Sequence, residues 1–293
     1  MLPRGVKLSR SSNAYSRTLH HWGQNMSSTF IAKGADGYDQ YMGRWSKRLA
    51  PMFLEFAEVA DGERIIDVGC GTGSLTFLIP DRADIAVVEA IDFEEQFIEA
   101  LKQRNTDARI SARKGDACSL PFGVDIFDRA LSMLVLHFVP TPQQAVAEMV
   151  RVVRPGGTVA ATVWDTFGGM PSQRIFWDTL AAIEPSAKSR RGLALVRPMT
   201  LPGELPRTFL AAGLENIVEK ILTIRMDFSN FDDYWLPLIN GQGTLAAFLS
   251  TLPQGVPEKV KAAVYQAYLS DQPDGPRSFA SVAWAVKGTV PSR

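Results

Sequence analysis

Short apolar runs alternate with amphipathic segments along most of the chain. Runs rich in Ile, Val and Ala, bounded by Gly, Pro or Asp, predict strands that are buried on both faces of a sheet. Segments between them, such as residues 49–59 and 141–153, place apolar side chains on one helix face. This alternation predicts an α/β fold. The predicted strands are residues 65–68, 85–91, 109–113, 127–138, 158–164, 216–228 and 279–286.

A glycine-rich turn joins the first predicted strand to a helical pattern that resumes at Leu75. Glycine has no Cβ, so such a turn can adopt positive φ and let a ligand approach the N–H groups at a helix start. A dinucleotide-binding turn, Gly-x-Gly-x-x-Gly, needs a glycine where this chain has Ser74. The carboxylate of Asp67, just before the turn, would repel a pyrophosphate but suits a ligand that carries an amino group. The glycines stand at alternate positions: Gly69, Gly71 and Gly73.

A second carboxylate, Asp92, ends the next predicted strand, about 20 residues beyond the glycine turn. A carboxylate at this position can accept hydrogen bonds from both hydroxyls of a ribose. Glu89 is a competing carboxylate, but it lies within the strand rather than at its end. Phe93 either lies against an adenine ring or packs the helix predicted at residues 94–102. Asp92 is therefore the strongest candidate for binding a nucleoside.

Taken in order, these motifs resemble those of the class I S-adenosylmethionine-dependent methyltransferases. Residues 67–73, Asp-x-Gly-x-Gly-x-Gly, resemble the first motif of that family, and residues 115–117, Gly-Asp-Ala, resemble its adenine-edge motif. Residues 154–157, Arg-Pro-Gly-Gly, look like the turn before its fifth strand. Residues 38–45 resemble the N-terminal cover of the small-molecule type related to the ubiquinone and menaquinone biosynthesis methyltransferases. The resemblance is specific over residues 38–165 and looser beyond them.

The resemblance implies a Rossmann-like fold, with a seven-stranded, mostly parallel sheet, helices on both faces and an antiparallel last strand. It also implies a single methyltransferase domain over residues 37–293, with the cofactor bound by residues 37–165. Helical insertions at residues 166–200 and 229–273 would cap the acceptor site. Residues 1–36 are rich in Ser and basic side chains, so we predict a disordered leader, with an organelle transit peptide as the alternative.

The cofactor implied by the resemblance is S-adenosyl-L-methionine, which leaves as S-adenosyl-L-homocysteine. By that resemblance Asp67 faces the amino acid end of the cofactor, the glycine turn passes beneath its ribose, and Asp116 accepts a hydrogen bond from its adenine. The tyrosines and the arginine of the N-terminal cover would close over the amino acid end, or the tyrosines would only pack the cover onto the domain. The implied cofactor-binding residues are Tyr38, Tyr41, Arg44, Asp67, Gly69, Cys70, Gly71, Gly73, Asp92, Phe93, Asp116, Ala117, Met133 and Leu134.

The acceptor should lie near the end of the fourth predicted strand, because ligands bind at the carboxyl ends of strands in open α/β sheets. His137 lies there, and its titration range would let it remove a proton from an acceptor hydroxyl, with Asp165 orienting the ring. Alternatively, His137 only caps the loop. The tryptophans of the insertions would line an apolar pocket or form the core of the insertions themselves. The candidate pocket residues are His137, Trp164, Trp177 and Trp235.

The predicted reaction is direct displacement of the methyl group from the sulfonium by an oxygen, nitrogen or carbon atom of a small acceptor. Because the leaving group is already activated, the protein mainly needs to align the two molecules and exclude water. Three alternatives remain open. They are a cofactor-binding module without catalysis, a nicotinamide-dependent oxidoreductase, which Asp67 and Ser74 disfavour, and a methyltransferase that acts on protein or RNA.

The charge balance limits the choice of partner. Lys plus Arg and Asp plus Glu both number 31, and this balance argues against nucleic acid or an anionic membrane as partner. No apolar run approaches the roughly 20 residues of a membrane-spanning helix. The two cysteines, Cys70 and Cys118, are too few for a disulfide framework or a zinc cluster. We therefore predict a cytoplasmic protein that uses no metal, and the sequence leaves its oligomeric state open.

Overall fold

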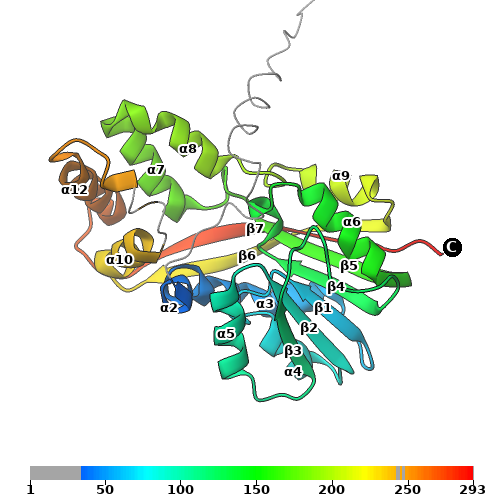
Figure 1. Cartoon of the computed structure of the whole chain (residues 1–293). Helices are drawn as coiled ribbons and strands as arrows, with labels where there is room; N and C mark the ends of the chain where they lie inside the picture. The colour runs from blue at the N-terminus through cyan, green and yellow to red at the C-terminus, as the bar shows by residue number, and fades with distance from the viewer. Residues whose placement is uncertain (1–33, 242–244, 246–247, 293) are drawn as a thin grey trace, which may run out of the picture.

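The computed structural model describes residues 34–241, 245 and 248–292. These residues build a seven-stranded sheet of order β3-β2-β1-β4-β5-β7-β6 (Figure 1). Strands β1 to β5 pair in parallel, whereas β7 runs antiparallel between β5 and β6. The predicted fold class, including its antiparallel last strand, is thereby confirmed. The strands are β1 (Arg64–Val68), β2 (Val87–Asp92), β3 (Ile110–Lys114), β4 (Phe127–Met133), β5 (Val153–Trp164), β6 (Glu215–Phe228) and β7 (Arg277–Thr289).

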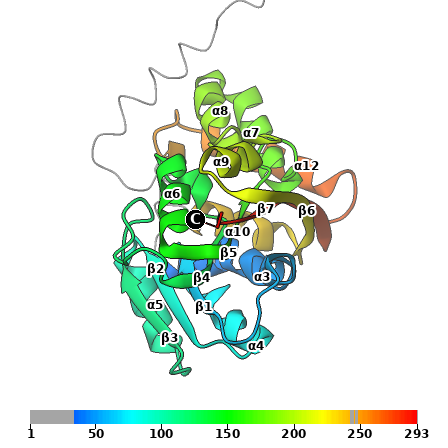
Figure 2. The ribbon, with the colours of Figure 1, turned by 90° about the vertical axis from the view of Figure 1, so that its right-hand side faces the viewer.

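Helices cover both faces of this sheet. Side chains of a strand alternate between faces, so Ile65 of β1 joins one cluster of buried apolar residues while Ile66 and Val68 join the other. Helices α3 and α5 supply the first cluster, and α6 and α9 supply the second. Figure 2 shows α6 and α9 above β5, with α3 and α4 below it. These helices are α3 (Arg44–Ala57), α4 (Ile79–Arg82), α5 (Glu95–Arg104), α6 (Pro142–Val152) and α9 (Glu204–Ala211).

The two regions predicted as insertions are helical and pack together. Helices α7 and α8 come from the first region, α10 and α12 come from the second, and α7 packs against α12. Figure 1 shows all four gathered at one end of the molecule, and they are called the cap below. Their bounds are α7 (Pro171–Ile183), α8 (Lys188–Leu195), α10 (Phe231–Gly241) and α12 (Val256–Leu269), with a short 3₁₀ turn, η4 (Pro185–Ala187), between α7 and α8.

Three predicted boundaries differ from the structure. Helix α2 (Gly34–Tyr38) begins inside the predicted leader, so residues 34–36 are helical, whereas residues 1–33 lie outside the described residues. The fourth strand ends at Met133 rather than at residue 138, because the chain turns there into η3 (Leu136–Phe138). The predicted turn at residues 154–157 lies within β5 and forms an irregularity in its pairing with β4.

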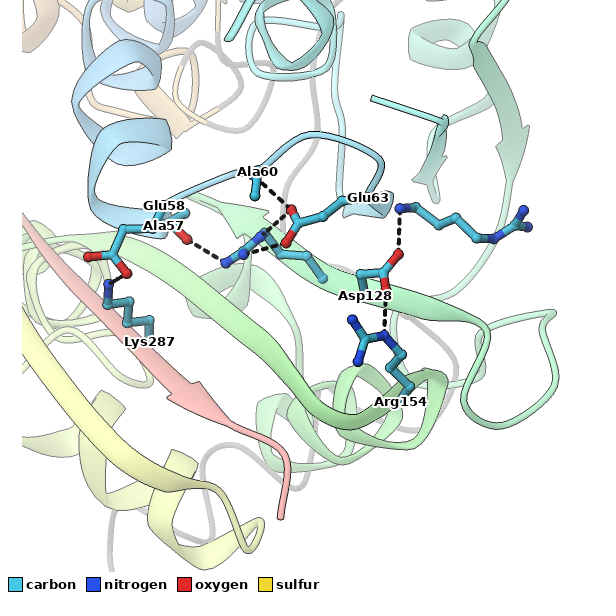
Figure 3. A network of polar contacts seen from close by, with 9 residues as sticks. Ala57, Glu58, Ala60, Glu63, Asp128, Arg154 and Lys287 are labelled. Atoms are coloured by element: carbon cyan, nitrogen blue, oxygen red, sulfur yellow. Dashed lines mark hydrogen bonds and ion pairs between the residues drawn. The ribbon is translucent and has the colours of Figure 1, made fainter. Parts of the chain in front are cut away.

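Ion pairs hold the amino ends of the central strands, at the edge opposite the site described below. Arg129 of β4 pairs with Glu63 at 2.6 Å and donates to the backbone oxygen of Ala57 at the end of α3. Asp128 accepts hydrogen bonds from the backbone N–H of Arg64 and from Arg154. Figure 3 shows Glu63 and Asp128 within this network. These ion pairs therefore lie away from the carboxyl ends of the strands, where the candidate site is found.

Candidate active site

A cavity opens at the carboxyl ends of β1, β2 and β4, the edge at which open α/β sheets bind ligands. Its floor is the glycine turn, where Gly69, Gly71 and Gly73 all have positive φ. A Cβ at Gly69 would lie 2.3 Å from Val135, and one at Gly73 would lie 2.4 Å from Phe77. A Cβ at Gly71 would meet nothing closer than 3.9 Å. The turn therefore packs tightly at its ends and presents bare backbone in its middle.

Asp67 lies beneath this turn and is almost completely buried, with 1% of its surface exposed. Its Oδ2 accepts a hydrogen bond of 2.6 Å from Thr76, whereas its Oδ1 has no partner among the residues that the structure describes. Burial raises the pKa of Asp67 to about 7. A buried carboxylate oxygen without a donor, in a residue that lines the cavity, matches a cationic amino group.

Asp92 ends β2 and connects that strand to the glycine turn. Its Oδ2 accepts from the backbone N–H of Gly71 at 2.8 Å, and its Oδ1 accepts from that of Glu94 at 2.9 Å. Burial raises the pKa of Asp92 to about 6, and these two backbone donors oppose that rise. Both donors fix the orientation of the carboxylate at the cavity wall, and the residue lines the cavity.

The predicted adenine region lies at the other end of this cavity. Phe93 is 41% exposed, and the Lys114 ammonium lies 5.8 Å from its ring centre. Asp116 accepts a hydrogen bond of 2.8 Å from the backbone N–H of Cys118, and this bond holds the turn that follows β3. Phe93, Asp116 and Ala117 all line the cavity, as do Met133 and Leu134 on its far wall.

The N-terminal segment α2 and the following π-helical turn, η1 (Asp39–Gly43), cover the cavity. Tyr38 lines it, with its ring 5.1 Å from that of Phe97. Asp39 accepts from the hydroxyl of Thr72 at 2.5 Å and from Arg104 at 2.7 Å. These bonds tie the cover to the glycine turn on one side and to α5 on the other. Sequence reasoning missed Asp39, because an acidic residue beside a predicted tyrosine motif carries no signal of its own.

A second cavity adjoins the first beneath the cap. The two share wall residues, among them Tyr38 and Leu134. Leu134 adopts a φ of +65°, an uncommon conformation for a branched side chain, and follows directly on β4. His137, Trp164 and Trp177 all line the second cavity, so three of the predicted pocket residues lie together. We call this space the acceptor cavity and the first space the donor cavity, after the roles that the sequence predicts for them.

His137 is 2% exposed, and its Nδ1 has no hydrogen-bond partner among the described residues. Burial, together with the nearby charge of Arg197, holds the pKa of His137 well below its usual value. The ring is therefore neutral at pH 7. Among the described residues, no hydrogen bond joins His137 to Asp165, whose Oδ1 accepts from the backbone N–H groups of Phe167 and Gly168. In the described part of the chain, no cluster of His, Cys, Asp or Glu is arranged to hold a metal.

Comparison with known proteins gives a match to one family model. Residues 66–161, which contain most of the donor cavity, match the family model described as a methyltransferase domain. This part of the chain resembles a methyltransferase domain. The fold agrees, since phosphoethanolamine N-methyltransferase 2 from Haemonchus contortus, solved in complex with S-adenosyl-L-methionine, superposes with a TM-score of 0.54 at 18% identity. That superposition covers 88% of this chain and 57% of the other.

Two curated relatives also match the methyltransferase domain. Demethylmenaquinone methyltransferase from Renibacterium salmoninarum is 33% identical over 147 residues, which cover 50% of this chain and 60% of the relative. Ubiquinone/menaquinone biosynthesis C-methyltransferase from Paracoccus denitrificans is 36% identical over 131 residues, 42% of this chain and 50% of the relative. The chain spans about half the length of the curated relatives it matches.

The structure does not bring four of the predicted residues to the cavities assigned to them. Arg44, in the segment predicted to be the N-terminal cover, pairs with Asp233 of α10 at 2.6 Å. Tyr41 lines the acceptor cavity instead, and its hydroxyl accepts a bond of 2.6 Å from Gln173. Trp235 stacks on Phe231 inside the cap. Gly73 shapes the turn without lining either cavity.

Arg197 is the functional candidate that sequence reasoning missed. It follows α8 and lines the acceptor cavity, although nothing in the pattern around residues 196–198 sets this arginine apart from those on the surface. Over the residues that the structure describes, none of the helices has the length and apolarity needed to cross a bilayer.

Proposed function

We propose that this protein transfers a methyl group from S-adenosyl-L-methionine to a small molecule by direct displacement. The observation that carries this proposal is the pair of adjoining cavities that meet at Tyr38 and Leu134. When bound in the donor cavity, the cofactor supplies a methyl group on a positively charged sulfur, which needs little further activation.

The donor cavity fits this cofactor at its two ends. The Oδ1 atom of Asp67, which has no partner among the described residues, suits the amino group of the cofactor. Asp92 offers a carboxylate held in place by backbone donors, which suits the two ribose hydroxyls. Gly71 lets the ligand lie against the backbone between them. Asp116 and Ala117 line the part that suits the adenine.

The acceptor cavity aligns the second reactant and keeps water away. Its wall is largely apolar and aromatic, and it includes Trp164, Trp177 and Phe138. The two relatives are named for quinone-type molecules, and an aromatic wall of this kind accommodates a ring. The neutral ring of His137 can accept a proton, but its low pKa makes it a weak base. Alignment and exclusion of water therefore supply most of the rate enhancement.

Binding of S-adenosyl-L-homocysteine tests the donor site. Asp92→Ala should weaken binding by about 10- to 100-fold, the range expected for loss of charge-assisted hydrogen bonds. Glu89→Gln is the matched control, because Glu89 lies on the same strand but pairs with Arg113 outside the cavity. Isothermal titration calorimetry measures both variants. Unchanged affinity in Asp92→Ala would contradict the ribose assignment, and tight binding of NADH by the unchanged protein would favour the oxidoreductase alternative.

A transfer assay separates an enzyme from a module that only binds the cofactor. The protein is incubated with S-adenosyl-L-methionine carrying a tritiated methyl group and with a metabolite extract, and the label is followed into small molecules. Transfer that is lost in Asp92→Ala supports the proposal. Cofactor binding without transfer to any extract fraction would indicate a non-catalytic module.

A further inference from the structure

Arg197 gives the acceptor cavity a single formal charge. Among the side chains that line this cavity, no Asp or Glu is present, and the remaining members are apolar or neutral. The backbone of Arg197 is held in place, because the Thr200 hydroxyl donates to its carbonyl oxygen at 2.9 Å. Thr200 also receives a hydrogen bond of 3.1 Å from Thr166 on the cavity wall. The fold therefore fixes the backbone position of Arg197 at this cavity.

This cation lacks an acidic partner within the described residues. No Asp or Glu there forms an ion pair with Arg197, and its guanidinium lies over the ring of Phe138, 4.8 Å from the ring centre. Burial lowers the pKa of Arg197, although an arginine remains charged at pH 7. The side chain is only partly exposed, so an anionic group of a ligand would supply the charge partner that this cation lacks. Arg190 and Arg191, by contrast, lie outside the cavity lining.

We propose that the methyl acceptor carries a carboxylate that pairs with Arg197, on an otherwise apolar body that bears a ring. A guanidinium matches a carboxylate with two parallel hydrogen bonds, and such a match orients the ligand as well as binding it. The ring would lie against Trp164 and Trp177, on the same cavity wall. This inference rests on the proposed function, because it assigns the substrate class of the acceptor cavity.

Matched probes test the charge preference directly. The full chain, saturated with S-adenosyl-L-homocysteine, is titrated with 1-hydroxy-2-naphthoate and with the corresponding amide, 1-hydroxy-2-naphthamide, in a calorimeter. The acid should bind at least about tenfold more tightly than the amide, since charge-assisted bonds contribute more than neutral ones. Arg197→Met should abolish this preference, and Arg197→Lys should keep part of it. Arg207→Met, at an exposed position of α9, should leave it unchanged.

Several results would overturn this inference. They are equal affinity for acid and amide in the unchanged protein, a preference that survives in Arg197→Met, or loss of the preference in Arg207→Met. Tighter binding of 1-naphthyl phosphate than of the acid would indicate that the acceptor carries a phosphate rather than a carboxylate. Weakened binding of S-adenosyl-L-homocysteine in Arg197→Met would indicate that Arg197 contacts the cofactor rather than the acceptor.

The same titrations separate this inference from the proposed function. Failure of the unchanged protein to bind S-adenosyl-L-homocysteine counts against the proposed function, and the probes are then compared without it. Normal binding of S-adenosyl-L-homocysteine with no acid preference counts against the role of Arg197 alone. The melting temperature of each variant shows that it is folded.

Discussion

Asp67 and Asp92, two of the carboxylates that line the donor cavity, differ in the hydrogen bonds that they receive. Asp92 accepts two backbone N–H groups, whereas Asp67 accepts one hydroxyl and keeps one oxygen without a partner in the described structure. Donors favour the charged form of a carboxylate, and burial disfavours it. The pKa of Asp67 accordingly rises to about 7, and that of Asp92 to about 6. Asp67 is thus the group that gains more from a cationic ligand.

The raised pKa of Asp67 predicts a pH-dependent stability of the ligand-free protein. The folded state keeps the Asp67 proton up to about pH 7, whereas the unfolded chain loses it near the ordinary aspartate pKa of about 3.9. The folded state therefore binds more protons in this window, and the free energy of unfolding should fall by up to about 1.4 kcal/mol per pH unit as the pH rises. Asp67→Asn should reduce this slope between about pH 6 and 7, above the pKa of Asp92.

Urea denaturation at closely spaced pH values measures the two slopes. The asparagine can still accept the hydroxyl of Thr76, so the fold should be retained. Identical slopes in Asp67→Asn and in the unchanged protein would show that Asp67 does not hold a proton in the folded state.

At the scale of elements, the two ends of the sheet are built differently. The amino ends of β1 and β4 are closed by a buried ion pair and a backbone bond from Arg129. The carboxyl ends carry the glycine turn and the residue at φ +65°, Leu134. A buried ion pair thus holds the end away from the cavities, and the end that lines the cavities contains the strained backbone of Leu134.

Arg129→Met should cost about 3–5 kcal/mol of unfolding free energy, because it leaves Glu63 partly buried without its partner. Arg154→Met provides the control. Arg154 also makes an ion pair at this edge, with Asp128, but its side chain is 55% exposed, so the loss should stay within about 1 kcal/mol. Guanidinium chloride unfolding gives both values. Similar losses in the two variants would mean that burial of the Arg129 pair does not set its contribution.

At the scale of the whole molecule, the cap and the first face of the sheet share one buried cluster. It extends from Trp45 and Phe53 of α3 to Trp235 and Tyr268 of the cap. Within it, the rings of Tyr234 and Tyr268 are stacked 5.4 Å apart. Cap and sheet should therefore unfold together rather than as separate units.

Trp235→Ala should lower the unfolding free energy by about 3–5 kcal/mol, the usual loss for a large buried side chain, with a single transition. The affinity for S-adenosyl-L-homocysteine should not change, because Trp235 lines neither cavity. Leu236→Ala is the control, since Leu236 is the next residue of α10 but is 45% exposed. A small loss of stability combined with altered binding of the naphthoate probe would indicate that Trp235 lines the acceptor pocket, as predicted from sequence.

Features set by local sequence were predictable, and features set by packing were not. The strands and the glycine turn follow from apolar runs and from residues such as Gly69, whose backbone conformation is encoded locally. The placement of Asp67 and Asp92 at one cavity follows from the parallel order of β1 and β2. By contrast, Arg44 forms an ion pair with Asp233, which lies far along the chain, and Arg197 lines the acceptor cavity. The periodicity of apolar residues does not predict contacts between residues so far apart in the sequence.

Leu134 lines both cavities, and its backbone conformation can be weighed against the packing of its side chain. A left-handed backbone costs a non-glycine residue about 1–2 kcal/mol, and glycine would remove that penalty. A glycine there would also delete a buried side chain, at a loss of about 2–5 kcal/mol, so the net change would be unfavourable. Because Leu134 lines both cavities, a glycine would also remove bulk from the wall that they share. Under the proposed function, the bulk at residue 134 would set how closely the two reactants can approach each other.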